Sequence, residues 1–372
     1  MGGKALPGVQ RLSAQTHREL QTRLVPSLRK HFALVGVPRS LANKRSHGDL
    51  DLVVSGQVPV AEARKLLQSE LGARASVANG AMISFNVDGF QVDVTLLHTK
   101  PAGDTTGPTL EVDARKQAFN AYIGFMDFGD FSRILGMLLT PRGLRWTSSG
   151  LLLDVRAPET ISEGNSEQKQ RQQHQHDTRR IASLPLTQSI PDALLFLRYD
   201  PAPWIDGFID ETHMFDFLVR GSPWFDRDAF ARVVQGKAFD RPVMRMFLEY
   251  LAVEGGSTCQ GGGVGGDDIK EASKVLMVNQ DGLGNSAVEE PSLRELALHH
   301  FLKQDEYHRI LAEYARQREF DERIKSQFNG ELIARILGID VLKEGRLVGQ
   351  VKRAMQQELE QGIMKPKIGG KR

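Results

Sequence analysis

Leu34-Val35-Gly36-Val37-Pro38-Arg39-Ser40 and, shortly after it, Ser46-His47-Gly48-Asp49-Leu50-Asp51-Leu52-Val53 are the stretches of sequence that decide the fold. Because side chains alternate between the two faces of a strand, Asp49 and Asp51 are predicted to point the same way while Leu50 and Leu52 enter the core. Neighbouring carboxylates repel each other, and a hard divalent cation is the usual partner that keeps both ionised. The pattern therefore predicts a metal site on a strand, after a glycine turn and a small basic loop suited to a phosphate-bearing ligand.

A third carboxylate, Asp93, fits the same site. Residues 81–87 and 90–97 are predicted to be strands, and Asp88-Gly89 between them is a strong signal for a two-residue hairpin. In the second strand Asp93 shares a face with Gln91 and Thr95, where an unpaired buried charge would be costly. Placed beside Asp49 and Asp51 across a sheet, Asp93 would complete a site of three carboxylates.

These motifs resemble the DNA polymerase beta-like nucleotidyltransferase superfamily over residues 20–100, about a quarter of the chain. The shared pattern is a strand with a glycine turn, a loop, an Asp-apolar-Asp strand and a third acid on a later strand. The resemblance implies an α/β (α+β) fold, a mixed sheet with flanking helices, followed here by a mainly helical region. One position departs from the family: Val37 stands where a Ser usually follows the turn glycine.

The resemblance also implies roles for the site residues. Asp49, Asp51 and Asp93 would be the catalytic and metal-binding residues, with two Mg²⁺ ions as the expected cofactor and Mn²⁺ as an alternative. Asp93 would bind the second metal and help to deprotonate the attacking hydroxyl. The nucleotide-binding residues would come from the turn and loop, with Ser40 or Ser46 supplying the hydroxyl that Val37 lacks: Gly36, Val37, Arg39, Ser40, Lys44, Arg45 and Ser46.

Composition excludes several classes of protein. The 372 residues are 40% hydrophobic and 25% charged, as in ordinary globular proteins, and the net charge of +2 is too small to indicate nucleic-acid binding by itself. A single cysteine, Cys259, excludes a disulfide framework. No apolar run approaches the roughly 18 residues of a membrane span. An intracellular location, cytoplasmic or nuclear, is expected. The basic segment at residues 10–30 is predicted to be a helix that packs beside the first strand; a mitochondrial transit peptide, and with it a mitochondrial location, is the alternative.

The predicted organisation is an α/β domain over residues 1–160, a disordered insert over 161–183 and a helical domain over 184–372. The insert is rich in Gln, Glu, Lys, Arg and His and poor in large apolar residues, so it is not expected to pack. A glycine-rich loop at about 255–290 is predicted to interrupt the helical domain. Within these regions, helices are expected over 16–35 (ending in a short strand), 60–72, 114–139 (broken at 124–129), much of 190–253, and 291–329 as one long helix, with a hairpin over 144–155.

Asp127-Phe128-Gly129 copies the metal-binding tripeptide of protein kinases, but the other kinase motifs are missing upstream. Asp127 and Asp130 are instead predicted to cap a helix over residues 131–139. A position for Asp130 in the active site is the alternative.

Near the C-terminus, residues 328–351 resemble, weakly, the helix–loop–helix found late in tRNA CCA-adding enzymes. Basic side chains surround this predicted helix pair, so it could bind a phosphate backbone. A plain packing unit is the alternative.

The predicted function is metal-dependent transfer of NMP from an NTP to a hydroxyl acceptor, with RNA as the favoured acceptor and no membrane partner. One rival is a binding module with a nucleotidyltransferase fold that has lost catalysis, which Val37 supports. The other is a glycosyltransferase that uses Asp49-Leu50-Asp51 as a metal-binding pair. That motif normally follows a complete nucleotide-binding α/β half, and only 48 residues precede it here.

Neutralising Arg346, Lys352 and Arg353 together should weaken RNA binding and flatten its salt dependence by about one unit of slope for each RNA phosphate that the variant no longer neutralises. NTP binding at the carboxylates should not change. Filter binding of a single-stranded RNA across a salt series measures both quantities. Unchanged affinity and slope would mean that this segment is only a packing unit.

Overall fold

The computed structural model describes residues 5–56, 58–97, 108–158, 180–227, 230, 233, 241–254, 292–327 and 350. The chain divides into two compact units, Met1–Asp154 with Ser183–Gln304, and Val155–Ala182 with Asp305–Arg372. The first unit holds most of the predicted α/β domain together with the beginning of the predicted helical domain.

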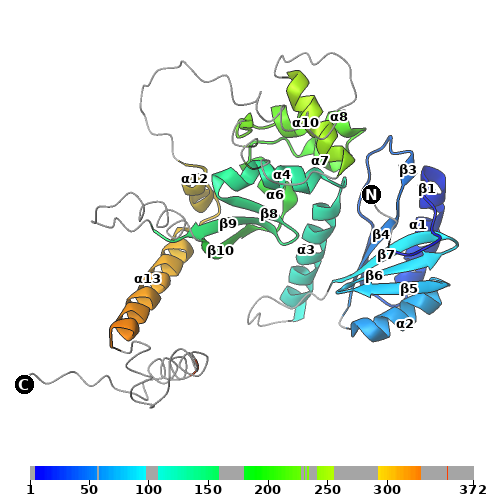
Figure 1. The fold of residues 1–372 in the computed structure, drawn as a ribbon, viewed down its shortest axis with the longest axis horizontal. Helices are drawn as coiled ribbons and strands as arrows, with labels where there is room; N and C mark the ends of the chain where they lie inside the picture. Colours follow the sequence, from blue (N-terminus) through cyan, green and yellow to red (C-terminus); the bar gives the residue numbers. More distant parts are fainter. Residues whose placement is uncertain are drawn as a thin grey trace, which may run out of the picture. The chain divides into compact units, whose positions relative to one another are not determined.

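A five-stranded mixed sheet carries the predicted carboxylates, in the order β2-β4-β7-β6-β5 (Figure 1). Strand β4 pairs in parallel with β7, and the other neighbours are antiparallel. The predicted hairpin is confirmed: Asp88 and Gly89 have φ angles of 53° and 84°, as a tight hairpin turn requires. The strands are β2 (Leu34–Gly36), β4 (Leu50–Ser55), β5 (Ala75–Asn79), β6 (Met82–Val87) and β7 (Phe90–Leu97).

Two helices, α1 (Ala14–Leu28) and α2 (Val60–Glu70), join the sheet in one hydrophobic core. Leu50, Leu52, Val92 and Val94 all belong to this core, as the predicted alternation in the two strands requires. The basic N-terminal segment is thus the packing helix that the sequence favours, and it begins at a Ser13 cap. A short pair of strands, β1 (Leu12–Ser13) and β3 (Ser46–His47), lies beside it.

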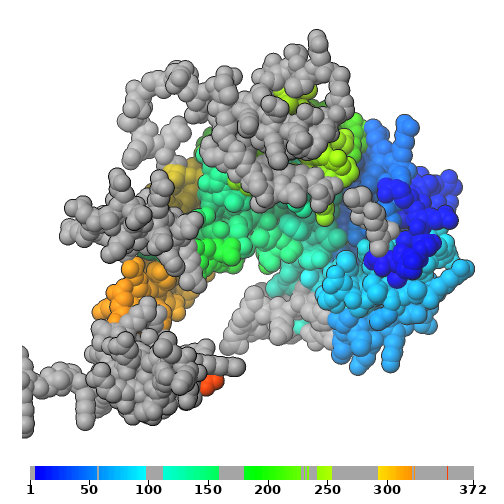
Figure 2. Space-filling view, in the orientation of Figure 1, coloured from blue at the N-terminus to red at the C-terminus, as the bar shows by residue number. Residues whose placement is uncertain are grey.

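The mixed α/β class is confirmed, and the first unit continues into a mainly helical part. Helices α3 (Pro108–Met126) and α4 (Phe131–Leu139) are separated at the predicted break. Helix α3 contacts β2, and the space-filling view shows the blue and cyan sheet residues directly against the green helical part (Figure 2). After η1 (Thr140–Arg142), the strands β8 (Leu144–Thr147) and β9 (Gly150–Arg156) form the predicted second hairpin.

A third strand in this small sheet, β10 (Arg180–Thr187), corrects the predicted insert. Residues 180–183, predicted to belong to the insert, are the first half of this strand. Its second half contains the buried residues Leu184 and Leu186, which hold the strand in the core. The rest of the predicted insert, 161–179, lies outside the described residues.

Residues 190–253 are mostly helical where they are described, as predicted. Aromatic side chains form the centre of this part: Phe208 contacts Phe128, Phe131 and Phe217, with ring centroids 4.9, 5.6 and 5.2 Å apart. The helices are α6 (Ile190–Phe196), α7 (Ala202–Asp206), α8 (Glu211–Arg220) and α10 (Pro242–Glu254).

The predicted single helix over 291–329 is wrong. The structure has α12 (Leu293–His300), which begins with a capping box from Ser292 and Glu295, and then α13 (Gln304–Gln327). Leu302 between them has a φ of 53°, and the Lys303 amide turns back to the carbonyl of Leu298. This left-handed residue ends the helical path even though the composition on both sides is helix-forming.

Other predicted features fall outside the described residues: the glycine-rich loop at about 255–290 and the C-terminal helix pair with Arg346, Lys352 and Arg353. Within the parts that are described, no helix combines the length and apolar character needed to cross a bilayer.

Replacing Gly150 with Ala should lower the free energy of unfolding by on the order of 3 kcal/mol, from backbone strain plus overpacking. Gly150 has a φ of 99°, and a Cβ atom there would collide with the Thr187 carbonyl oxygen of β10. Gly72 is the control, because its φ of 60° carries strain but its surroundings are open; Gly72→Ala should cost only about 1 kcal/mol. Denaturant unfolding measures both, and equal losses would contradict the contact with β10.

Candidate functional site

Two of the predicted carboxylates lie side by side on neighbouring strands. Asp51 of β4 is the direct partner of Asp93 in the parallel register with β7. Asp49 comes just before β4 begins at Leu50, so the Asp-Leu-Asp motif spans the start of the strand and does not lie wholly within it. The sheet therefore brings the three residues close together, because the register aligns the start of β4 with Val92 and Asp93 of β7.

The electrostatics of this group match its crowding. Burial raises the pKa of Asp51 from 3.8 to about 7, and repulsion from Asp49 and then Asp93 adds to the shift, while Lys44 opposes it. Burial also raises the pKa of Asp93, and hydrogen bonds from Ser84 and Gln91 partly offset that shift. In the absence of a cation Asp51 and Asp93 therefore resist ionisation, which is the behaviour expected of divalent-metal ligands.

Side-chain orientation in the structure is less favourable to a metal than the backbone placement. Gln91 Nε2 donates to both carboxylate oxygens of Asp93, at 3.0 Å each. Across the described parts of the chain, no three His, Cys, Asp or Glu side chains are arranged as ligands of one metal ion. Oxygen donors and charge fit Mg²⁺ or Mn²⁺, and the metal site at Asp49, Asp51 and Asp93 stays a prediction.

Asp49 and Asp51 line a cleft of about 910 Å³. Ser40, Leu41 and Lys44 form the wall that follows β2. Residues from α3, α4, β8, α8 and α10 form the other walls, so the helical part of the first unit borders the same cleft as Asp49 and Asp51. Its side chains at the cleft include Phe125, Ser132, Arg133, Arg145, Trp146, Glu211 and Arg241. Asp93 is not among the residues that line the cleft.

Of the seven predicted nucleotide-binding residues, two line the cleft and five do not. Ser40 and Lys44 line the cleft, so Ser40 is the better placed of the two serines expected to replace the missing hydroxyl. Gly36 and Val37 have packing roles instead: a Cβ at Gly36 would lie 2.6 Å from Ile123 Cδ1 of α3, and Val37 packs on the sheet core.

Of the other predicted nucleotide-binding residues, Ser46 belongs to β3 and Arg45 directly precedes that strand. Arg45 is exposed, and Ser46 accepts a hydrogen bond from Arg11 at 2.9 Å. Neither residue is among those that line the cleft, although Arg11 is.

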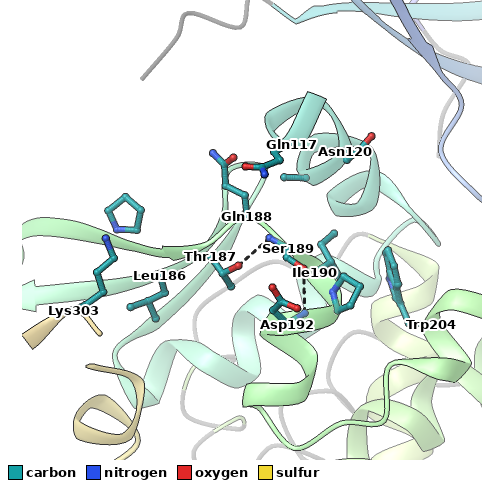
Figure 3. Close-up of a pocket in the computed structure, with 13 residues that line it drawn as sticks. Gln117, Asn120, Leu186, Thr187, Gln188, Ser189, Ile190, Asp192, Trp204 and Lys303 are labelled. Carbon is teal, nitrogen blue, oxygen red and sulfur yellow. Dashed lines mark hydrogen bonds between the residues drawn. The ribbon is translucent and has the colours of Figure 1, made fainter. Parts of the chain in front are cut away.

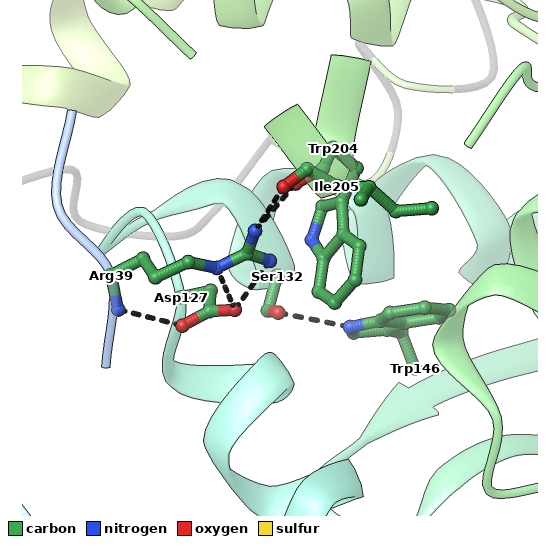
Figure 4. Close-up of polar contacts among 6 residues, drawn as sticks. All are labelled: Arg39, Asp127, Ser132, Trp146, Trp204 and Ile205. Atoms are coloured by element: carbon green, nitrogen blue, oxygen red, sulfur yellow. Dashed lines mark hydrogen bonds and ion pairs between the residues drawn. The ribbon is translucent and has the colours of Figure 1, made fainter. Parts of the chain in front are cut away.

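Arg39 has a different position from the one expected for a phosphate ligand (Figure 4). Its Nε and Nη2 contact Oδ2 of Asp127 at 2.8 and 2.7 Å, and its Nη1 donates to the carbonyls of Trp204 and Ile205 at 2.9 and 2.8 Å. The guanidinium is therefore committed to protein groups, and Arg39 is not among the residues that line the cleft.

The predicted caps of α4 are also corrected. Asp130 occupies the N-cap position but its side chain makes no capping bond; it accepts instead from Arg241 Nη1 at 2.7 Å. Asp127 binds Arg39 and does not cap the helix. Asp130 lines the same cleft as Asp49 and Asp51, and its position in an active site stays a prediction.

Several cleft residues were missed by the sequence analysis, above all Arg11, Arg133 and Arg241. Arg11 belongs to a basic segment that could have drawn attention to it. For Arg133 and Arg241 no local signal exists, because only the tertiary fold brings α4 and the start of α10 to the carboxylates.

A second hollow of about 640 Å³ lies in the helical part (Figure 3). Its lining is rich in amide and hydroxyl side chains, among them Gln117, Asn120, Gln188 and Ser189. The predicted carboxylates are not among its residues, so it is separate from the candidate site.

Comparisons with known proteins add no assignment. No protein-family model matches the chain, and no curated protein shows significant similarity to it.

Asp51→Asn should stabilise the protein in chelator, and more at pH 8 than at pH 5.5. The folded-state pKa of Asp51 is raised, so its contribution to stability is present below the unfolded pKa and is lost as pH rises from about 4 through about 7. Removing this titration should gain on the order of a few kcal/mol at pH 8. Denaturant unfolding at both pH values measures the gain. Asp113→Asn, on the exposed surface of α3, is the control; a gain independent of pH would contradict the raised pKa.

Proposed function

We propose that the protein is a metal-dependent nucleotidyltransferase that transfers NMP from an NTP to a hydroxyl acceptor. The observation that carries this proposal is the parallel register that sets Asp51 opposite Asp93, with Asp49 and Asp51 on the wall of a cleft. Three mutually repelling carboxylates on two neighbouring parallel strands suit a pair of divalent ions better than any structural role.

Each residue of the candidate site has a role in this proposal. Asp49 and Asp51 would hold a metal ion that accompanies the triphosphate, and Asp93 would hold a second one. Bound Mg²⁺ would lower the pKa of the acceptor hydroxyl and offset the charge of the leaving pyrophosphate. Ser40 and Lys44, which line the same cleft, would bind phosphate oxygens of the NTP. The charge of Lys44 already acts on Asp51.

The cleft also has room and charge for an acceptor. Arg133 lies exposed on α4, and Arg241 reaches the cleft while paired with Asp130. Cationic side chains on the cleft wall formed by the helical part suit a phosphodiester backbone, so RNA is the favoured acceptor. RNA and NTPs are intracellular, and a cytoplasmic, nuclear or mitochondrial location belongs to the same proposal.

The two rival functions gain little from the geometry. Val37 packs against the core, while Ser40 offers a hydroxyl at the cleft, so loss of the usual Ser does not by itself support an inactive binding module. The glycosyltransferase interpretation calls for a parallel α/β half before the Asp pair, whereas the five-stranded sheet has a single parallel pair.

Incubation of the full chain with total RNA, Mg²⁺ and each of the four radiolabelled NTPs in turn should label RNA with at least one of them. Asp51→Ala should reduce the labelling about 100-fold or more, because it removes a metal ligand. Asp113→Ala should leave it unchanged. Labelling that persists in chelator or in Asp51→Ala would contradict the proposed chemistry, and labelling of no RNA by any NTP would favour the binding module.

A further inference from the structure

The strongest feature outside the carboxylates is the set of contacts around Arg39, here called the Arg39 clamp: Arg39, Asp127, Phe128, Trp204 and the Ile205 carbonyl. Arg39 belongs to the loop between β2 and β3, whereas the other members come from the α3–α4 turn and α7. Asp127 is 2% exposed and binds both the backbone amide of Arg39, at 2.7 Å, and its guanidinium. A buried carboxylate is thus matched to one cation from a distant part of the sequence.

Two aromatic rings complete the clamp. The guanidinium carbon of Arg39 lies 4.3 Å from the ring centroid of Trp204 and 4.7 Å from that of Phe128. Figure 4 shows Arg39 between the Asp127 carboxylate and the backbone carbonyls of Trp204 and Ile205. A planar guanidinium suits this site, because it can stack on rings while its edges donate to a carboxylate and to carbonyls.

The same loop is held at further points. Ala42 and Asn43 donate their amides to the carbonyls of Phe208 and Ile209, at 2.9 and 2.8 Å. The amide of Phe128 donates to the Arg39 carbonyl at 2.7 Å. The bonded loop residues are Arg39, which directly precedes Ser40, and Ala42 and Asn43, which directly precede Lys44. Ser40 and Lys44 are the two loop residues that the proposed function assigns to phosphate binding.

We propose that Asp127, acting through Arg39, is a positioning residue that fixes the loop 39–44 against the helical part and so holds Ser40 and Lys44 on the wall of the cleft. This inference rests on the proposed function for the identity of the ligand, an NTP triphosphate. It assigns a role to Asp127-Phe128-Gly129, the tripeptide that the metal chemistry does not use. Arg39 itself makes no phosphate contact.

The first test measures the loop directly, in the full chain without ligand. Asp127→Asn keeps the shape of the side chain and removes its charge, so hydrogen exchange at the amides of Ala42 and Asn43 should accelerate about tenfold or more. The amides of Leu52 and Val53 in β4 should exchange as in the wild type. Asp216→Asn is the matched control, since Asp216 accepts from Tyr250 on α10 and does not line the cleft.

A conservative variant separates positioning from simple charge pairing. Arg39→Lys keeps the charge but cannot span a carboxylate and two carbonyls, so it should accelerate exchange at Ala42 and Asn43 as Asp127→Asn does. If Asp127→Asn does not fold, Trp204→Leu provides the same comparison with a smaller effect, about threefold, because it removes one ring and keeps the carbonyls.

The second test measures function. In the RNA-labelling assay, Asp127→Asn should raise the KM for the NTP about tenfold while kcat stays within about threefold, because phosphate binding is weakened and the metal ligands are untouched. Unchanged exchange at Ala42 and Asn43 in Asp127→Asn, equal acceleration across β4, wild-type exchange in Arg39→Lys, or a loosened loop with an unchanged KM would each overturn the proposal. If the wild type labels no RNA, the proposed function fails, and the exchange comparison still decides whether the clamp fixes the loop.

Discussion

The parallel pairing of β4 with β7 is the constraint on which the candidate site depends. It places Asp51 directly opposite Asp93, and neither residue can move away without breaking the ladder that buries Leu52 and Val94. Backbone hydrogen bonds and apolar burial thus hold together two carboxylates that repel each other. The stability of the core offsets the repulsion between these carboxylates, which would not come together by themselves. Such an arrangement is typical of sites that bind cations.

Much of the sheet could be predicted from local sequence. The Asp88-Gly89 turn and the alternation of apolar and polar residues over 90–95 are typical of a strand that follows a tight hairpin turn. The roles of individual loop residues could not be predicted in the same way. Gly36 matches a phosphate turn in sequence, yet its missing side chain makes room for α3, and that contact depends on Ile123, 87 residues later. Arg39 likewise finds Asp127 only in the folded protein.

Helical elements show the same limit. Residues 293–327 have helix-forming composition throughout, but Leu302 adopts a left-handed conformation while neighbouring Phe301 contacts Phe196 of α6, with ring centroids 5.1 Å apart. Tertiary packing decides the break, so no local pattern marks it. The walls of the cleft are a further case, because Arg133 and Arg241 are ordinary exposed residues until the fold brings them near the carboxylates. The sequence therefore predicted the strand positions of the acids better than the residues that surround them.

Phe128 makes the turn between α3 and α4 dependent on residues that are distant in sequence. Its φ of 58° and the 66° of Gly129 make two successive left-handed residues, and for a phenylalanine this conformation is intrinsically unfavourable. The contacts that offset the cost come from elsewhere: the Arg39 carbonyl accepts from its amide, and the Phe208 ring meets its own. Both partners are distant in sequence, so the bend between α3 and α4 depends on tertiary contacts that its own residues do not supply. The direction in which α4 leaves α3 is therefore set in part by the loop that follows β2.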